Sequence, residues 1–128
     1  MSLYSGLFAE NEIIVSPKDT AVQYGSGSLE VFATPAMIAL MEKTAMLCIA
    51  KKIEAGMTSV GTSIQVKHLK ATPIGNAVSC IAELIEIDRA KLTFNVEVFD
   101  NDGIIGQGTH TRFLVDEKQF MSKLNDNT

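Results

Sequence analysis

Residues 32–53, which read FATPAMIALMEKTAMLCIAKKI, decide the fold of this chain because they predict one long amphipathic helix. Thr34 followed by Pro35 predicts its start, with the threonine as the N-cap and the proline at the first helical position. A helix of about 19 residues is roughly 28 Å long. Apolar side chains recur in it at steps of three and four residues, which indicates one buried stripe. The stripe consists of Ile38, Met41, Ala45, Cys48, Ile49 and Ile53.

Glu42 is the one charge that does not fit this stripe. It lies four residues after Ile38 and three before Ala45, so its carboxylate projects from the face that should be buried. A buried carboxylate costs free energy unless it is paired or takes part in chemistry. Two interpretations therefore remain open: Glu42 pairs with a cationic side chain of the core, or it is a catalytic carboxylate.

The composition is that of one globular domain spanning residues 1–128. The chain is 46% apolar and 20% charged, which suits a soluble protein with a sizeable core. A net charge of −4 argues against a general nucleic-acid or membrane surface, and no apolar run approaches the ~20 residues of a membrane span. Cys48 and Cys80 are expected as core residues rather than as a disulfide. With no signal-peptide pattern in residues 1–16, we expect a cytoplasmic protein.

The rest of the chain predicts one antiparallel sheet. Alternating apolar residues indicate strands, and residues 101–103, Asn-Asp-Gly, are a strong hairpin signal between two of them. Asp116 predicts the cap of a short final helix. One long helix followed by a meander favours an α+β layer in which the sheet curls round the helix. The predicted strands are residues 11–15, 61–69, 77–87, 92–100 and 104–115, and the final helix is 117–124.

Six short motifs, in this order and spacing, resemble the hotdog-fold acyl-CoA thioesterases of the fluoroacetyl-CoA thioesterase type. The resemblance covers residues 12–123 and implies a hotdog fold, in which a curved antiparallel sheet wraps one long central helix. It rests most on Thr34, Glu42 and His68, which are eight and then twenty-six residues apart, with Gly61 between them. The motifs are Val31-Phe32-Ala33-Thr34, Met41-Glu42, Val60-Gly61-Thr62, Val66-Lys67-His68, Ala71-Thr72-Pro73 and Gly108-Thr109-His110-Thr111-Arg112.

The resemblance implies a catalytic set of Thr34, Glu42 and His68, with the Gly61 amide near the thioester oxygen and Arg112 at the substrate. An imidazole with a pKa near 6.5 exchanges protons at neutral pH, so His68 suits acid–base chemistry. Glu42 could attack the carbonyl, activate a water molecule or fix the His68 tautomer. We hypothesise that Glu42 and His68 activate the attack while Thr34 positions it. The structural alternatives are an N-cap role for Thr34 and a packing role for His68.

The function implied is hydrolysis of a small or medium acyl-CoA. The alternative is a non-catalytic module that binds acyl-CoA; an enoyl-CoA hydratase is disfavoured because its Asp–His pair is missing from the sequence. Residues 25–29 carry no aromatic side chain where the fluoroacetyl-specific enzyme has phenylalanines, so the resemblance does not extend to fluoroacetyl selectivity.

The resemblance also implies partners. It implies a homodimer with active sites at the interface, and no cofactor or metal beyond the CoA thioester that serves as substrate. Cationic side chains are needed for the phosphates of CoA. The candidates are Lys67, Lys70, Arg89, Lys91 and Arg112.

Overall fold

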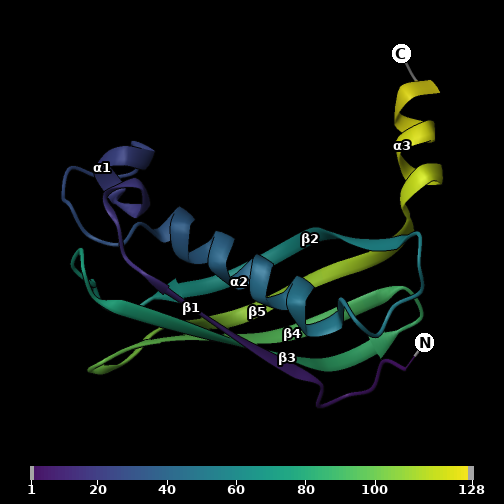
Figure 1. Ribbon diagram of the computed structural model, residues 1–128, viewed down its shortest axis with the longest axis horizontal. Coiled ribbons are helices and arrows are strands. Elements are labelled where there is room, and N and C mark those ends of the chain that lie inside the picture. The colour runs from purple at the N-terminus through teal and green to yellow at the C-terminus, as the bar shows by residue number, and fades with distance from the viewer. Residues whose placement is uncertain (1, 127–128) are drawn as a thin grey trace.

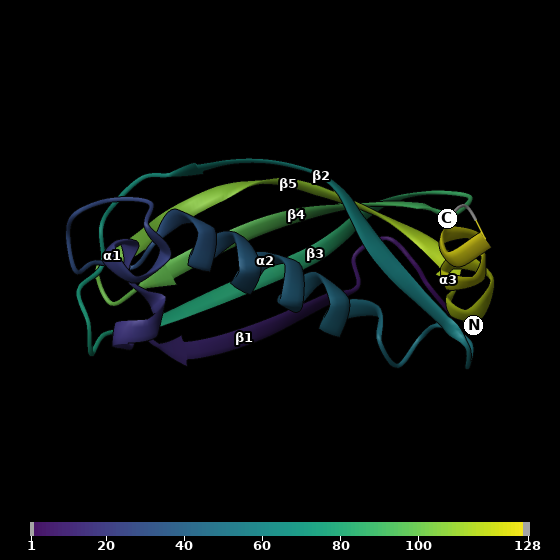
Figure 2. The ribbon, with the colours of Figure 1, turned by 90° about the horizontal axis from the view of Figure 1, so that it is seen from above.

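A long helix, α2 (Thr34–Ile49), lies in the concave face of one curved antiparallel sheet (Figures 1 and 2). The computed structural model describes residues 2–126. The sheet has five strands in the order β1-β3-β4-β5-β2, which confirms the predicted α+β architecture. The strands are β1 (Phe8–Ile14), β2 (Met57–His68), β3 (Ala77–Asp88), β4 (Lys91–Asp100) and β5 (Gly103–Asp116).

The order of the strands follows from the lengths of their connections. Tight turns join β3 to β4 and β4 to β5, so these strands form a meander, and Asp100 pairs with Gly103 across the predicted Asn-Asp-Gly turn. β1 pairs with β3 on one side of this meander, and β2 pairs with β5 on the other side. Both therefore lie at edges of the sheet, and β2 is the longer edge, with 12 residues against 7.

The core lies between α2 and the concave face of the sheet. Leu92, Phe94, Val96 and Val98 of β4 alternate along the strand and are fully buried, as their spacing predicts. The predicted stripe of α2 is partly wrong, because Ile38 is only half-buried and the helix ends before Ile53. The stripe is instead centred on Met37, Met41 and Ala45. The buried residues of α2 are Ala36, Met37, Leu40, Met41, Thr44, Ala45, Cys48 and Ile49.

The predicted N-cap of α2 is also wrong. Ala33 is the N-cap and has no side chain that could cap the helix, while Thr34 is the first helical residue. Pro35 is the second, where its missing N–H costs nothing because the first N–H groups of a helix have no partner in the helix. The hydroxyl of Thr34 is therefore not used for capping. It is available for a contact with another element.

The segment between β1 and α2 has more structure than its Ser- and Gly-rich sequence predicts. It contains a turn of 3-10 helix (Pro17–Asp19) and the short helix α1 (Ala21–Tyr24). Thr20 caps α1 by accepting a hydrogen bond from the Gln23 amide at 3.3 Å, and Gly25 ends it in the left-handed conformation. This segment lies over the N-terminal end of α2 (Figure 1).

Several boundaries differ from prediction. β1 begins at Phe8 instead of residue 11, and β2 begins at Met57 instead of residue 61. The final helix, α3 (Glu117–Asp126), begins as predicted, since the Gln119 amide donates to Asp116 Oδ1 at 2.9 Å. No helix among residues 2–126 combines the length and the apolar character needed to cross a membrane.

Gly106 of β5 lies against the Met37 side chain of α2. A methyl group added at Gly106 would collide with the Met37 side chain, and one added at Gly108 would collide with the backbone of Gln65 on β2. The absence of a side chain at Gly106 therefore lets Met37 pack directly against β5, beneath the helix that carries Thr34 and Glu42.

Candidate active site

Thr34 and His68 meet where the start of α2 faces the end of β2. The Oγ1 atom of Thr34 and the Nδ1 atom of His68 are 2.8 Å apart, within hydrogen-bonding distance. The Phe32 ring packs edge-on against the imidazole, with the ring centres 6.2 Å apart. The pair borders a cleft of about 290 Å³. Its other walls are Ala21, Ser26, Val31, Ala33, Leu69, Lys70 and Ala71.

His68 is held in a neutral state by its surroundings. Burial lowers its pKa below the ordinary 6.5, and a backbone interaction with Lys70 offsets only part of this effect. The second ring nitrogen, Nε2, is buried and makes no hydrogen bond of good geometry with any residue in 2–126. A buried polar atom without a partner is costly, so such atoms often mark sites of chemistry. Nε2 is therefore the ring nitrogen of His68 that Thr34 does not engage.

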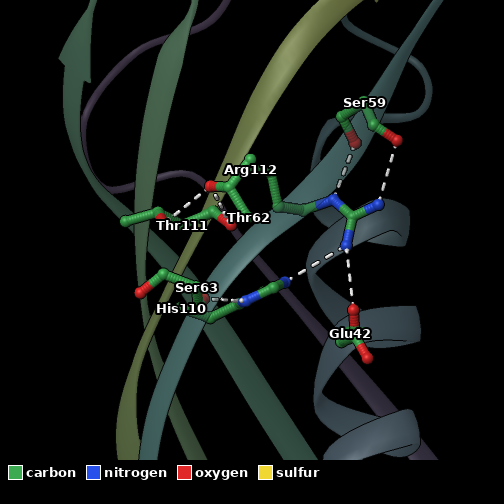
Figure 3. Close-up of polar contacts among 7 residues, drawn as sticks. All are labelled: Glu42, Ser59, Thr62, Ser63, His110, Thr111 and Arg112. Carbon is green, nitrogen blue, oxygen red and sulfur yellow. Dashed lines mark hydrogen bonds and ion pairs between the residues drawn. The ribbon is translucent and has the colours of Figure 1, made fainter.

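Glu42 belongs to a second group of polar side chains, two turns further along α2 (Figure 3). Its Oε2 atom lies 3.7 Å from Nη1 of Arg112 on β5. The Arg112 side chain is 5% exposed and that of Glu42 is 43% exposed. Glu42 therefore lies at the border of the buried face, and the expectation of a fully buried carboxylate is wrong. The interpretation of an ion pair with a core cation is confirmed, and it leaves one face of the carboxylate open to solvent.

Arg112 is fixed by hydrogen bonds along its whole guanidinium (Figure 3). Nε donates to Ser59 Oγ at 2.7 Å, and Nη2 donates to the Ser59 carbonyl at 3.0 Å. Nη1 contacts Nε2 of His110 at 3.1 Å. Burial lowers the pKa of Arg112, an effect that Glu42 opposes, yet a guanidinium stays charged at any physiological pH. A buried cation thus sits directly behind the Glu42 carboxylate.

Gly61 of β2 lies directly against the Glu42 carboxylate. A Cβ atom at Gly61 would lie 2.8 Å from Glu42 Oε2 and 3.3 Å from Arg112 Nη1, so any side chain here would push the Glu42 carboxylate out of its present position. The strand also bulges here, because Gly61 pairs with Arg112 while Ser63 pairs with Thr111, which leaves Thr62 as the extra residue. The Thr62 hydroxyl instead contacts the Thr111 hydroxyl at 3.0 Å. Glu42, Gly61, Ser63 and His110 border a second cleft, of about 270 Å³.

The five predicted site residues thus fall into two groups within one chain. Thr34 and His68 form one, and Glu42, Gly61 and Arg112 form the other. The eight residues from Thr34 to Glu42 correspond to about 12 Å along the helix. Within the described residues, His68 is oriented by Thr34, so orientation of its tautomer by Glu42 of the same chain is not seen.

Two residues of the second group were not assigned a role from the sequence. Ser59 lies just before the predicted strand 61–69, and His110 was named only as a member of the Gly108-Thr109-His110-Thr111-Arg112 motif. The available signal was alternation, since His110 and Arg112 share one face of a strand that also buries apolar residues. The candidate cations differ in availability: Lys70 is paired with Asp100 at 2.8 Å and with Asp102 at 3.3 Å. Lys67 is exposed and precedes His68.

Comparisons with known proteins point to one family. The family model of the fluoroacetyl-CoA-specific thioesterase matches residues 15–118. A protein of Streptantibioticus cattleyicolor named fluoroacetyl-CoA thioesterase is 38% identical over 99 residues, which cover 77% of this chain and 71% of that protein.

Solved structures agree with this. A mutant of the fluoroacetyl-CoA-specific thioesterase superposes with a TM-score of 0.92 at 32% identity, over 100% of this chain and 99% of the other. A hot-dog-like protein from Thermanaerovibrio acidaminovorans, 20% identical, superposes with a TM-score of 0.88 over 96% of this chain and 91% of the other. The second likeness concerns the fold alone. The predicted hotdog fold is confirmed.

Proposed function

This chain belongs to the fluoroacetyl-CoA-specific thioesterase family, and we propose that it hydrolyses a small or medium acyl-CoA with a Thr34–His68–Glu42 set. The observation that carries the proposal is the hydrogen bond between Thr34 and His68 beside a cleft; among residues 2–126, the buried Nε2 of His68 makes no hydrogen bond of good geometry. Every step is assigned to side chains, backbone amides and water, so the proposed reaction uses no cofactor.

The chemistry demands activation of the nucleophile more than of the leaving group. A thiolate whose parent thiol has a pKa of about 8.5 leaves readily, whereas water is a weak nucleophile at neutral pH. We assign activation of this water to Glu42 and His68. We assign the proton of His68 to Nδ1, which donates it to the Thr34 hydroxyl and so leaves the lone pair on Nε2. Water attacks the carbonyl carbon, its proton passes to the base, the C–S bond breaks, and the CoA thiolate takes up a proton.

The carbonyl oxygen gains negative charge in this attack and needs donors. The amide of Gly61 and the first amides of α2 are suited to this task, because a helix N-terminus favours negative charge and a glycine allows close approach. We assign Arg112 to holding the Glu42 carboxylate, since its own donors are occupied by Ser59 and His110.

A second copy of the chain is proposed to complete the site. β2 is a 12-residue edge strand, and an uncovered edge of that length is a template for pairing. The group around Glu42 contacts β2 at Gly61, seven residues before His68. Two antiparallel β2 strands related by a two-fold axis near their middle bring the Gly61 end of one beside the His68 end of the other. The partner's Glu42 then joins Thr34 and His68 in one site.

The apolar surface next to β2 supports this dimer. Met46 and Leu47 of α2 are 45% and 47% exposed, and they border a cleft of about 460 Å³ together with Met57 at the start of β2. Exposed apolar surface of this kind beside a strand edge favours burial against a partner. Lys67, exposed beside His68, is assigned to the phosphates of CoA.

A panel of acyl-CoA substrates tests the proposed activity. Free thiol is measured after incubation with acetyl-, fluoroacetyl-, butyryl- and hexanoyl-CoA, and turnover is expected with at least the shorter chains. Because residues 25–29 carry no aromatic side chain, we expect kcat/KM for fluoroacetyl-CoA and acetyl-CoA to agree within about tenfold. Tight binding of these esters without any thiol release would contradict hydrolysis and favour an acyl-CoA-binding module.

A further inference from the structure

His110 is a buried residue with a defined set of contacts and no role in the reaction described above. It lies on β5, is 1% exposed, and packs its ring against Phe94 with the ring centres 6.2 Å apart. Its Nδ1 atom is 2.8 Å from the Ser63 carbonyl, and its Nε2 atom is 3.1 Å from Arg112 Nη1. Both ring nitrogens are therefore occupied (Figure 3).

The protonation state of His110 follows from its partners. A guanidinium has only donors, so the Nε2 atom facing Arg112 must accept, and a carbonyl only accepts, so Nδ1 must carry the proton. Burial lowers the pKa of His110, the Ser63 carbonyl opposes this, the Arg112 charge lowers it further, and Glu42 raises it. The charged groups facing the ring are Arg112 and Glu42. Both geometry and charge hold His110 as the neutral Nδ1–H tautomer.

We propose that His110 is a positioning residue that holds the Arg112 guanidinium against Glu42 and thereby sets where the Glu42 carboxylate lies during hydrolysis. This rests on the proposed catalytic role of Glu42. The contacts run in series from Ser63 to Glu42. The Ser63 carbonyl fixes the His110 ring, the ring accepts a hydrogen bond from Arg112 Nη1, and Nη1 faces Glu42 Oε2 at 3.7 Å.

Ser59 and His110 together hold the planar guanidinium, and His110 supplies the hydrogen-bond acceptor for Nη1. Ser59 fixes Nε and Nη2 but makes no bond to Nη1, and Gly61 offers no side chain. Without an acceptor at His110, Nη1 would keep the Glu42 contact as its one polar interaction among residues 2–126. A half-exposed ion pair by itself defines geometry weakly. Catalysis depends on such geometry, since a misplacement of about 1 Å can cost 100-fold in rate.

Two substitutions separate the bonds of His110. In His110→Gln the side-chain oxygen can take the place of Nε2 and accept from Arg112. In His110→Asn the amide nitrogen can take the place of Nδ1 and donate to Ser63, but the acceptor for Arg112 is lost. We expect kcat of H110Q to stay within about threefold of wild type and kcat of H110N to fall about 10- to 30-fold, with KM changed less than about twofold in both.

Two further measurements keep the outcome decisive. The double variant E42Q/H110N should have the same kcat as E42Q alone, because the effects of two substitutions do not add when one residue acts through the other. The ¹³C signal of the Glu42 side-chain carboxyl, assigned by its loss in E42Q, should shift in H110N and not in H110Q, whether or not the protein turns over any substrate. Equal kcat and equal Glu42 signals in H110N and H110Q would overturn the proposal. Absence of thiol release by the wild-type protein would instead overturn the proposed function.

Discussion

Replacing Glu42 with glutamine is expected to lower kcat about 1,000-fold, which corresponds to about 4 kcal/mol of transition-state stabilisation. Glutamine keeps the size of the side chain and can still contact Arg112, but it cannot take a proton from water. KM should change little, since the carboxylate acts on water rather than on CoA. Single-turnover and steady-state thiol release measure the two constants.

The fold should survive this substitution. The Glu42 side chain is 43% exposed, so its ion pair with Arg112 is partly screened, and its loss should cost less than about 1 kcal/mol of stability. Glu54→Gln is the matched control, because Glu54 is an exposed carboxylate beyond the end of α2. Activity of E42Q within about threefold of E54Q would contradict a catalytic role for Glu42.

Replacing His68 with alanine is expected to lower kcat/KM at least about 100-fold. The substitution removes the unpartnered Nε2 and also releases the Thr34 hydroxyl, which has no capping role to return to. Because burial lowers the pKa of His68, the neutral form persists below pH 6.5, and the wild-type activity should begin to fall only under more acidic conditions. A pH profile of kcat/KM, recorded beside that of H68A, measures both effects.

Thr34→Ser is the control for His68. It keeps a hydroxyl within reach of Nδ1, so kcat/KM should stay within about threefold of wild type. In Thr34→Val the hydroxyl is lost, and kcat/KM should fall about tenfold, because Thr34 orients the ring without attacking the substrate. An activity loss in Thr34→Val as large as that in E42Q would contradict this and identify Thr34 as the nucleophile.

Much of the fold was predictable because the patterns are local. The spacing of apolar residues in α2, the alternation in β4 and the Asn-Asp-Gly turn each encode one element. The ends of elements were less predictable. β2 begins four residues before the predicted strand, because its pairing with β5 extends back to Met57, opposite Asp116.

The candidate site was predictable only as a set of residues. The Thr-Pro pair indicates an N-cap, yet the hydroxyl of Thr34 bonds to a residue 34 positions later, and no local pattern carries that information. Glu42 was recognisable as a misplaced charge, but its partner Arg112 and the supporting Ser59 lie on strands that meet only in the folded sheet. Long-range pairing of this kind requires the register of β2 against β5.

The central claim is that Thr34 and His68 of one chain act with the partner's Glu42. Co-expression of E42Q and H68A chains with two different affinity tags, and purification through both tags, yields heterodimers alone. In each heterodimer, one site combines Thr34 and His68 of the E42Q chain with Glu42 of the H68A chain and is intact. The other site lacks both His68 and Glu42. We expect about half of the wild-type thiol release, although each parent homodimer is nearly inactive. Heterodimers of confirmed mass that are as inactive as their parents would contradict a shared site.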